Sequence, residues 1–400
     1  MKCHISTDPM IRLRVLNRCV WLFAAVMALA TQTLSAQAQS YKVLYSFSQD
    51  SADGQYPSSP LVRDTQGNLY GVALGGSFGR GVVFEVSSTG ADQVLYNFSG
   101  SDGDGDTPDA MSFRDAAGNL FGTTFQGGAY GYGTVFEVDA QGRETVVYNF
   151  CAKTPCTKGT FPGGVTASKN GTLYGITYAG GNFSCNITGC GTVFKINRKG
   201  DLTLLHSFGG ADGDYPNAGL VLDSSGDAYG TTMYGGAYGR GAVFRVTAAG
   251  NETVEYSFGG GADGAYPNGG LVRDAEGNLY GTSYQDGAYG YGIIFKVTAS
   301  GQFIVLYSFP GGVSGANPYA TLSLDQRGNL FGVTAAGGTH NFGVVFELDT
   351  SGKETVLHSF GKETDGVHPS GLIIDASGNL YGTTYQGGKD NYGSVFEVMP

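Results

Sequence analysis

Short apolar runs alternate with glycine-rich turns from residue 40 to the end of the chain, and the pattern repeats every 50 to 55 residues. Three segments mark each repeat. The first is of the GNLYG type, and its last glycine falls at Gly71, Gly122, Gly175, Gly230, Gly281, Gly332 and Gly382. The second is of the GTVFEV type, with its phenylalanine at Phe84, Phe136, Phe194, Phe244, Phe295, Phe346 and Phe396. The third is of the VLYSF type and ends at Phe47, Phe98, Phe150, Phe208, Phe258, Phe309 and Phe360. Seven copies in a fixed order predict seven equivalent structural units.

One unit, residues 267–309, contains four strand-like runs at 270–273, 278–283, 293–297 and 303–309, lettered A to D below. The A–B and C–D turns are short and carry glycine where a hairpin favours positive φ. Apolar residues in B and C are consecutive rather than alternating, so both faces of the sheet must be covered. Antiparallel four-stranded sheets stacked around an axis achieve this, and we predict an all-β fold, a β-propeller.

The two ends of the repeat array predict how the ring closes. Residues 41–47 form a lone D-type strand, and the chain stops after a C-type strand that ends at Val398. The first strand would complete the last blade, which gives seven full blades and leaves no exposed sheet edge. We expect one seven-bladed propeller over residues 39–400, with blades at approximately 57–98, 108–150, 162–208, 216–258, 267–309, 318–360 and 369–400 plus 41–47.

Residues 1–38 have the pattern of a signal peptide. Arg12, Arg14 and Arg18 precede the apolar run at 20–30, and residues 36–38 (Ala-Gln-Ala) fit a signal-peptidase site. We therefore expect an exported protein that is secreted, periplasmic or at the cell surface. No second long apolar stretch follows, so no membrane-spanning segment is expected in the mature chain.

Composition narrows the classes of fold and function further. Sixty-eight of the 400 residues are glycine and only 14% are charged, which disfavours long helices. At 41% hydrophobic residues the chain is too apolar to remain disordered. The formal net charge is −11, and −14 without residues 1–38. This charge argues against a nucleic-acid partner, because phosphate recognition needs clustered Lys and Arg.

The tandem pattern GNLYGTT, GGxxGxGTVFEV and ETVLYSF resembles the GloVer (Gloeobacter/Verrucomicrobia) extracellular repeat, and the resemblance covers essentially the whole chain after residue 38. It implies a bacterial, exported tandem-repeat protein of β-propeller-like fold. It implies no established activity and brings no catalytic residues.

In a propeller the B–C and D–A loops share one face, and here both loop classes carry repeated side chains. The D–A loops have a D-G-x-x-P signature, and the B–C loops read Gly-Gly-Ala-Tyr-Gly-Tyr-Gly or close to it. The D–A carboxylates are Asp53, Asp104, Asp212, Asp263 and Asp365. The residues before the proline include Tyr56, Phe161, Tyr215, Tyr266 and His368, and one B–C position holds Phe78, Tyr130, Tyr238, Tyr289 and His340.

Two interpretations of this face stay open. Aromatic rings beside carboxylates suit sugars, whose C–H faces stack on rings while their hydroxyls form hydrogen bonds. On this reading the binding residues are Tyr56, Phe78, Tyr130, Tyr215, Tyr238, Tyr266, Tyr289, Asp53, Asp212 and Asp263. On the other reading every blade needs these residues, because Asp-Gly forms an Asx-type turn and Tyr-Pro packs between blades. The B–C aromatics lie between glycines, so we expect them to be the more exposed set.

Residues that break the repeat are candidates for a site that is built once. Asp102, Asp104 and Asp106 resemble the start of a calcium loop, although Thr107 and Phe113 replace its usual glycine and glutamate. A solvated acidic loop is the alternative to a Ca²⁺ site there.

Histidines offer a second candidate for chemistry. His340, Asp365 and His368 are the candidates for catalysis on the loop face, but no serine or cysteine stands at a recognisable nucleophile elbow near them. His206 and His358 occupy a D-strand position that is tyrosine in the other repeats, so we expect them to be structural.

Four cysteines remain after residue 38, and all belong to the third repeat. An exported chain meets oxidising conditions, which favours disulfides Cys151–Cys156 and Cys185–Cys190. Pairing across the two loops and a zinc site of four cysteines are the alternatives.

Together these features predict an exported, non-catalytic binding or scaffold propeller without a cofactor, expected to be monomeric. Its loop face would engage a glycan, an envelope polymer or a protein partner. The alternative is a propeller-type hydrolase or lyase with Ca²⁺ or a His/Asp site in the central funnel. The two differ in whether unlike polar groups from several blades converge at the axis, and the repeats show mainly like groups.

Overall fold

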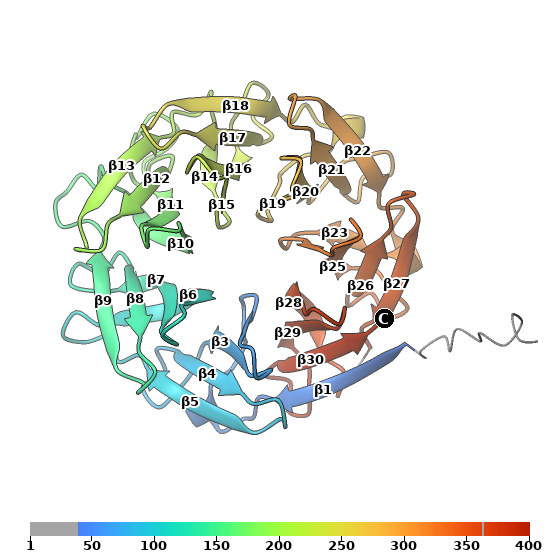
Figure 1. The fold of residues 1–400 in the computed structure, drawn as a ribbon, viewed down its shortest axis with the longest axis horizontal. Coiled ribbons are helices and arrows are strands. Elements are labelled where there is room, and N and C mark those ends of the chain that lie inside the picture. The colour runs from blue at the N-terminus through green and yellow to red at the C-terminus, as the bar shows by residue number, and fades with distance from the viewer. Residues whose placement is uncertain (1–38, 362–363) are drawn as a thin grey trace, which may run out of the picture. The chain divides into compact units, whose positions relative to one another are not determined.

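Each repeat folds as a four-stranded antiparallel sheet, and seven such sheets stand around a common axis (Figure 1). The structure is a computed structural model that describes residues 39–361 and 364–400. Ser40–Met399 forms one compact unit. The predicted all-β, seven-bladed fold is confirmed, whereas the predicted signal peptide lies outside the described residues.

The first three blades run from the innermost to the outermost strand in chain order. Blade one consists of β2 (Val62–Arg63), β3 (Leu69–Ala73), β4 (Val82–Val86) and β5 (Asp92–Asn97). Blade two consists of β6 (Gly105–Arg114), β7 (Leu120–Gly127), β8 (Thr134–Val138) and β9 (Glu144–Asn149). Blade three consists of β10 (Thr160–Ala167), β11 (Leu173–Ala179), β12 (Thr192–Ile196) and β13 (Leu202–Ser207).

Blades four and six differ in that their innermost strand is split into two short pieces. Blade four consists of β14 (Asp214–Pro216), β15 (Val221–Leu222), β16 (Ala228–Tyr234), β17 (Ala242–Val246) and β18 (Glu252–Ser257). Blade five consists of β19 (Val272–Arg273), β20 (Leu279–Ser283), β21 (Ile293–Val297) and β22 (Phe303–Ser308). Blade six consists of β23 (Ala316–Pro318), β24 (Ser323–Leu324), β25 (Leu330–Ala336), β26 (Val344–Leu348) and β27 (Glu354–Ser359). Three short 3₁₀ turns lie in the D–A loops: η1 (Ser51–Asp53), η2 (Gly261–Asp263) and η3 (Gly312–Ser314).

Blade seven joins the two ends of the ring. It consists of β28 (Val367–Ile374), β29 (Leu380–Gln386), β30 (Ser394–Met399) and the N-terminal strand β1 (Ser40–Ser46). In Figure 1 the blue β1 lies along the outside of the red β30. The two strands pair antiparallel from Ser40↔Met399 to Ser46↔Ser394. The predicted closure by the first strand is therefore observed.

The repeated glycine and phenylalanine meet inside each blade. The glycine that ends each GNLYG segment lies on strand B directly opposite the strand C phenylalanine, as in Gly71↔Phe84 and Gly230↔Phe244. A Cβ on this glycine would lie 2.5–2.7 Å from the ring in all seven blades. The ring therefore lies across bare backbone, which explains why the two residues recur together.

The phenylalanine at the end of strand D packs on the next blade. It is fully buried and meets the strand C phenylalanine of its neighbour at centroid distances of 5.0–5.3 Å. The pairs are edge-to-face, a favourable geometry for aromatic rings. One such pair joins every two neighbouring blades, and Phe47–Phe84 joins blade seven to blade one.

A second contact between blades lies on the loop face. The residue before the loop proline has φ between +53° and +61° in every blade, and its N–H donates to a B–C loop carbonyl of the preceding blade. The proline then packs on a glycine of that loop, where an added Cβ would lie 2.2–3.0 Å from Pro Cδ. Closure uses the same contact, between Pro57 and Gly393.

Candidate functional site

The repeated D–A carboxylates are engaged within their own loops. Asp263 accepts hydrogen bonds from Tyr256 Oη at 2.7 Å and the Gly259 N–H at 2.9 Å. Asp212 accepts from the Gly209 N–H and pairs with His206 Nε2, both at 2.8 Å. Asp53, one of the predicted binding residues, accepts from Tyr45. The strand D tyrosine or histidine thus anchors each of these carboxylates, and His206 takes the same position as the tyrosines of the other blades.

The D–A aromatics lie between blades. Tyr56 contacts the rings of Tyr385 and Tyr392 at centroid distances of 5.3 and 5.5 Å. Tyr215 and Tyr266 are likewise half-buried and contact rings of strand B. These three predicted binding residues therefore occupy packed positions with limited free ring area.

The B–C aromatics are the exposed set, as their glycine neighbours suggested. Phe78, Tyr130, Tyr238 and Tyr289 are 62%, 48%, 67% and 62% exposed. Their loops are tied to the outermost strand, for example by the Ala237 N–H to Ser257 Oγ at 3.2 Å. The exposed rings therefore lie on the loop face near the outer strands, apart from the half-buried D–A set.

His340, Asp365 and His368 do not form one catalytic group. Asp365 pairs with His358 Nε2 at 2.9 Å and accepts from the Gly361 N–H at 2.6 Å. His340 is exposed and bonds Thr339 Oγ1, while His368 Nδ1 lies 3.4 Å from the Ala335 carbonyl oxygen. Among the described residues, no hydrogen bond or ion pair joins these three side chains to one another.

The acidic residues of blade two have separate protein partners. Asp104 accepts from the N–H and Oγ of Ser99 at 2.6 and 2.8 Å. Asp106 is buried and pairs with Arg80 at 2.6 Å. Asp102 is exposed. The three carboxylates thus point to different environments, and a Ca²⁺ ion there would compete with these partners.

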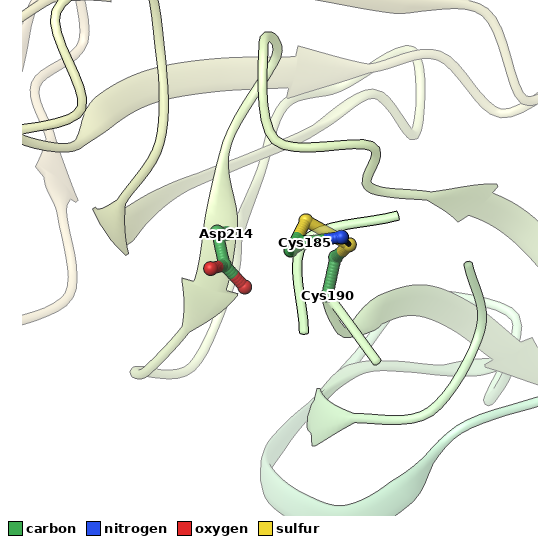
Figure 2. A group of neighbouring side chains, drawn as sticks. All are labelled: Cys185, Cys190 and Asp214. Atoms are coloured by element: carbon green, nitrogen blue, oxygen red, sulfur yellow. Dashed lines mark hydrogen bonds between the residues drawn. A yellow bond between two sulfur atoms is a disulfide. The ribbon is translucent and has the colours of Figure 1, made fainter. Parts of the chain in front are cut away.

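The cysteines pair as Cys151–Cys156 and Cys185–Cys190. Asp214 lies beside the second pair, as Figure 2 shows. The two sulfur atoms are bonded to each other, so they are not free thiolates for a metal. The disulfide reading is thus the one that the structure shows.

Unlike side chains meet at the axis, at positions that sequence reasoning did not single out. A cavity of about 500 Å³ is lined mainly by the inner strands of the blades and by the segments next to them, and all seven blades contribute. The position after the loop proline points to this axis, and it holds five residue types in the seven repeats. It holds Ser58, Asp109, Gly163, Asn217, Asn268, Tyr319 and Ser370, of which all but Gly163 line the cavity.

Asp109 is the only acidic or basic residue among the described residues that line this cavity. Burial raises the pKa of Asp109 to about 6, while a hydrogen bond from Tyr178 opposes the rise. Tyr178 Oη lies 3.1 Å from Asp109 Oδ2 and 3.2 Å from the Asn217 carbonyl oxygen. Asn217 in turn donates to Asn268. A network of carboxyl, phenol and amide groups therefore runs along one side of the cavity.

The cavity continues into a second hollow of about 550 Å³ toward the loop face. The two share Ser58, Asn268, Tyr319 and Ser370. Tyr284, Tyr385 and His368 line only the second hollow. Tyr385 is 37% exposed. Polar groups thus lie deep along the axis, and aromatic rings lie nearer the mouth.

The signal for this site was present in the sequence. When the seven repeats are placed in register, the proline is present in all seven, and the next position holds Ser, Asp, Gly, Asn or Tyr. No single residue type marks this position, so the D-G-x-x-P signature of the D–A loops does not include it.

A family model described as the Gloeobacter/Verrucomicrobia repeat matches residues 32–187 and 186–396. A search of curated protein sequences finds no match. Among the described residues, no helix has the length and apolar character needed to cross a bilayer.

Several solved structures share the fold at low identity. The extracellular domain of a one-component system from B. thetaiotaomicron has a TM-score of 0.54 at 11% identity, over 89% of this chain and 39% of that one. PorZ, a surface component of the type-IX secretion system of Porphyromonas gingivalis, has a TM-score of 0.53 at 14% identity, over 88% and 47%. A gluconolactonase from Xanthomonas campestris has a TM-score of 0.44 at 14% identity, over 90% and 89%. At such identities the likeness concerns the fold alone.

Proposed function

The chain belongs to the Gloeobacter/Verrucomicrobia repeat family, and we propose that it is an exported, non-catalytic binding propeller whose axial cavity takes the end of a glycan. The observation that carries this proposal is the set of unlike residues after the loop prolines. A seven-fold array needs no difference between blades for stability, but a small asymmetric ligand needs unlike groups on different sides.

The chemistry of the lining suits a polyhydroxylated ligand. Asp109 and Asn268 offer carboxyl and amide groups to hydroxyls, and both line the cavity. Tyr284 and Tyr385 at the mouth offer ring faces on which a sugar can stack. The exposed rings Phe78, Tyr130, Tyr238 and Tyr289 supply a second surface on the same face for the rest of a long polymer.

Binding is favoured over hydrolysis by the count of carboxylates. Glycoside hydrolysis ordinarily uses two carboxyl groups that flank the scissile bond. Asp109 is alone among the described residues that line the cavity. The His/Asp alternative on the loop face is weakened because Asp365 is engaged by His358.

Export is supported by the two disulfides, since such bonds persist in oxidising compartments. We propose export to the periplasm, the cell surface or the medium, without assigning one of the three.

The test is a glycan array with purified residues 39–400 and three variants. We expect a defined set of glycans to bind, and Asn268→Ala and Tyr385→Ala to weaken that binding at least tenfold. Tyr266→Ala serves as the control on the same face, because its ring contacts Tyr234 and Arg240 and neither of these lines the cavity. Binding that survives both cavity variants, or a product released from a bound glycan, would contradict the proposal.

A further inference from the structure

Every junction between neighbouring blades holds the same arrangement of side chains near the outer strands. A tyrosine or histidine on strand D, called the slot residue, lies beside the first residues of strand D of the next blade. The slot residues are Tyr45, Tyr96, Tyr148, His206, Tyr256, Tyr307 and His358. Each slot residue faces one residue of the next blade, four positions before the slot residue of that blade. In the same order, these facing residues are Asp92, Glu144, Leu202, Glu252, Phe303, Glu354 and Tyr41.

The junction between blades three and four is unlike the other six. Here the slot residue is His206, the D–A loop supplies Asp212, and the next blade supplies Glu252. One ligand atom from each of these three lies within 4.8 Å of the other two. We propose that these residues bind a divalent transition-metal cation of the Zn²⁺ type, which would join blade three to blade four.

The donor set selects the class of cation. One imidazole nitrogen and two carboxylates suit zinc and similar ions, whereas Ca²⁺ and Mg²⁺ prefer oxygen ligands alone. His206 Nε2 and Asp212 Oδ2 are 2.8 Å apart. Tetrahedral zinc with bonds of about 2.0–2.2 Å sets its ligand atoms roughly 3.3 Å apart. His206 and Asp212 would therefore open slightly, and Glu252, whose ligand atom lies within 4.8 Å of both, would adjust to match.

Glu252 supplies an independent indication of a ligand. Its Oε1 is fully buried, and among the described residues it has no hydrogen-bond partner. A buried carboxylate oxygen without a partner is costly, and a cation would satisfy it. Asp92, Glu144 and Glu354 have a similar orphan oxygen, but each faces a tyrosine, which is a poor partner in such a donor set.

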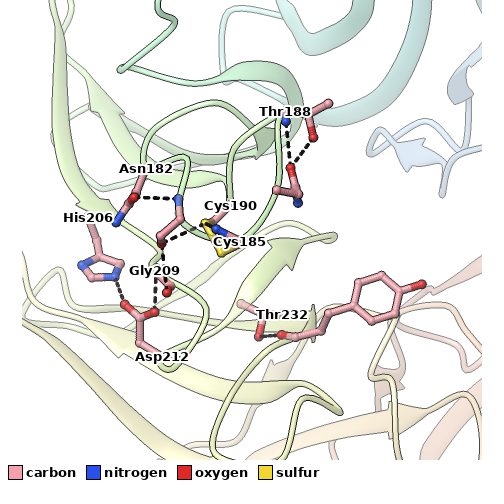
Figure 3. The surroundings of a disulfide bond; sticks show 11 residues. Asn182, Cys185, Thr188, Cys190, His206, Gly209, Asp212 and Thr232 are labelled. Carbon is pink, nitrogen blue, oxygen red and sulfur yellow. Dashed lines mark hydrogen bonds and ion pairs between the residues drawn. A yellow bond between two sulfur atoms is a disulfide. The ribbon is translucent and has the colours of Figure 1, made fainter.

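The loop that carries Asp212 is held in place by its surroundings, as Figure 3 shows. Asp212 Oδ1 accepts the Gly209 N–H at 2.8 Å, which leaves Oδ2 directed at His206. Ser184 Oγ donates to the Gly209 carbonyl oxygen at 3.2 Å, and Ser184 adjoins the Cys185–Cys190 disulfide. A disulfide-bonded loop therefore supports one metal ligand, which limits the entropy lost on binding.

The chain contains its own matched control. At the junction between blades six and seven, His358 pairs with Asp365 at 2.9 Å, much as His206 pairs with Asp212. The third position is Tyr41, which stacks on His358 at a centroid distance of 3.7 Å. This junction therefore has the histidine and one carboxylate but lacks the second carboxylate.

The experiment uses residues 39–400 without a histidine tag, freed of metal with a chelator. Isothermal titration calorimetry with ZnCl₂, and metal content by mass spectrometry, are measured for the parent, Glu252→Gln, His206→Tyr and His358→Tyr. Tyrosine is the residue that five other junctions carry, and glutamine keeps the shape of glutamate. CaCl₂ and MgCl₂ serve as competing ions.

We expect one Zn²⁺ per chain, bound at micromolar concentration and not displaced by equimolar Ca²⁺ or Mg²⁺. Glu252→Gln and His206→Tyr should weaken binding at least tenfold, and His358→Tyr should leave it unchanged. Zn²⁺ should raise the melting temperature of the parent and of His358→Tyr, but not of Glu252→Gln.

Absence of saturable Zn²⁺ binding by the folded parent would overturn the proposal. An equal loss in His358→Tyr would also overturn it, because the ion would then lie elsewhere. Tyr41→Glu adds a sharper check, since it gives the second junction the missing carboxylate. A second bound Zn²⁺ in that variant supports the proposal, and a single one contradicts the role assigned to the second carboxylate.

Discussion

The propeller has a repeated shell, made of the contacts between its blades, and a lining at its axis whose residues vary. In the shell, every junction uses the same phenylalanine pair and the same contact of proline on glycine. At the axis, the residue after the proline is of five types in seven blades, with serine and asparagine each occurring twice. Repeated residues thus hold the blades together, and residues that vary between blades line the candidate site.

The repeated carboxylates of the D–A loops belong to the shell and not to the candidate site. The carboxylates of the D–A loops recur because each supports a loop through a strand D tyrosine or histidine. Asp109 lies only five residues beyond Asp104, yet it faces the cavity. Of two nearby carboxylates, the repeated one supports the fold and the unrepeated one offers chemistry.

The largest expected effect follows from removing the closing strand. Deletion of residues 39–48 leaves β30 without its outer partner and takes away Phe47, which is fully buried against Phe84. At about 25 cal/mol per Å² of apolar surface, a loss of several kcal/mol is expected, comparable with the stability of many domains. A thermal melt against residues 39–400 is the measurement, and a midpoint within a degree or two of the parent would refute closure as a main source of stability.

A smaller effect is expected from one methyl group in the shell. Gly230→Ala would place its Cβ 2.7 Å from Phe244 and 2.9 Å from Leu220, so the unfolding free energy should fall by about 1–3 kcal/mol. Gly219→Ala is the matched control in the same blade, because nothing lies within 4 Å of its added Cβ. Urea unfolding of both variants checks this, and equal losses would show that the ring does not need the bare backbone.

The junctions should also respond to pH. Burial, with the nearby Asp104 carboxylate, raises the pKa of Glu144 to about 7. The unfolded carboxyl ionises near pH 4, so between about pH 4 and 7 the folded protein keeps a proton that the unfolded chain has released. The contribution of Glu144 to the unfolding free energy is therefore complete below about pH 4 and is lost as the pH rises to about 7.

Unfolding free energies at pH 5 and pH 8 test this sign. The parent should lose on the order of 1 kcal/mol more than Glu144→Gln over this interval, after allowance for solvent screening. A parent and variant with the same pH dependence would show that Glu144 titrates normally.

The smallest effect on stability is expected from the exposed rings. Tyr130, Tyr238 and Tyr289 are 48–67% exposed, so replacing all three by alanine should change the unfolding free energy by less than about 1 kcal/mol. Phe98→Ala, at a fully buried position, should cost about 3–5 kcal/mol. Collapse of the triple variant would assign these rings to the shell and remove them from the proposed binding face.

Strand positions were largely predictable from the local pattern. In residues 267–309 strand C was expected at 293–297 and is observed at Ile293–Val297, and strand B begins one residue later than expected. Strand A is shorter, at Val272–Arg273 instead of 270–273. Before it the chain lies close to the next blade, where a Cβ on Gly269 would lie 2.5 Å from the Ala320 carbonyl oxygen.

By itself the sequence determined the number of blades from the local periodicity, and the closing strand from the order of strand types along the chain. It also favoured the two disulfides, because the paired cysteines are close together in the chain. Only the tertiary structure decided which side chains share a space. The ring sets equivalent positions of neighbouring blades about 50 residues apart in the chain, so Tyr178 reaches Asp109, and Glu252 reaches His206. The residue before each loop proline has a left-handed backbone angle, and its N–H bonds the preceding blade, so the directions of the loop side chains depend on contacts between blades.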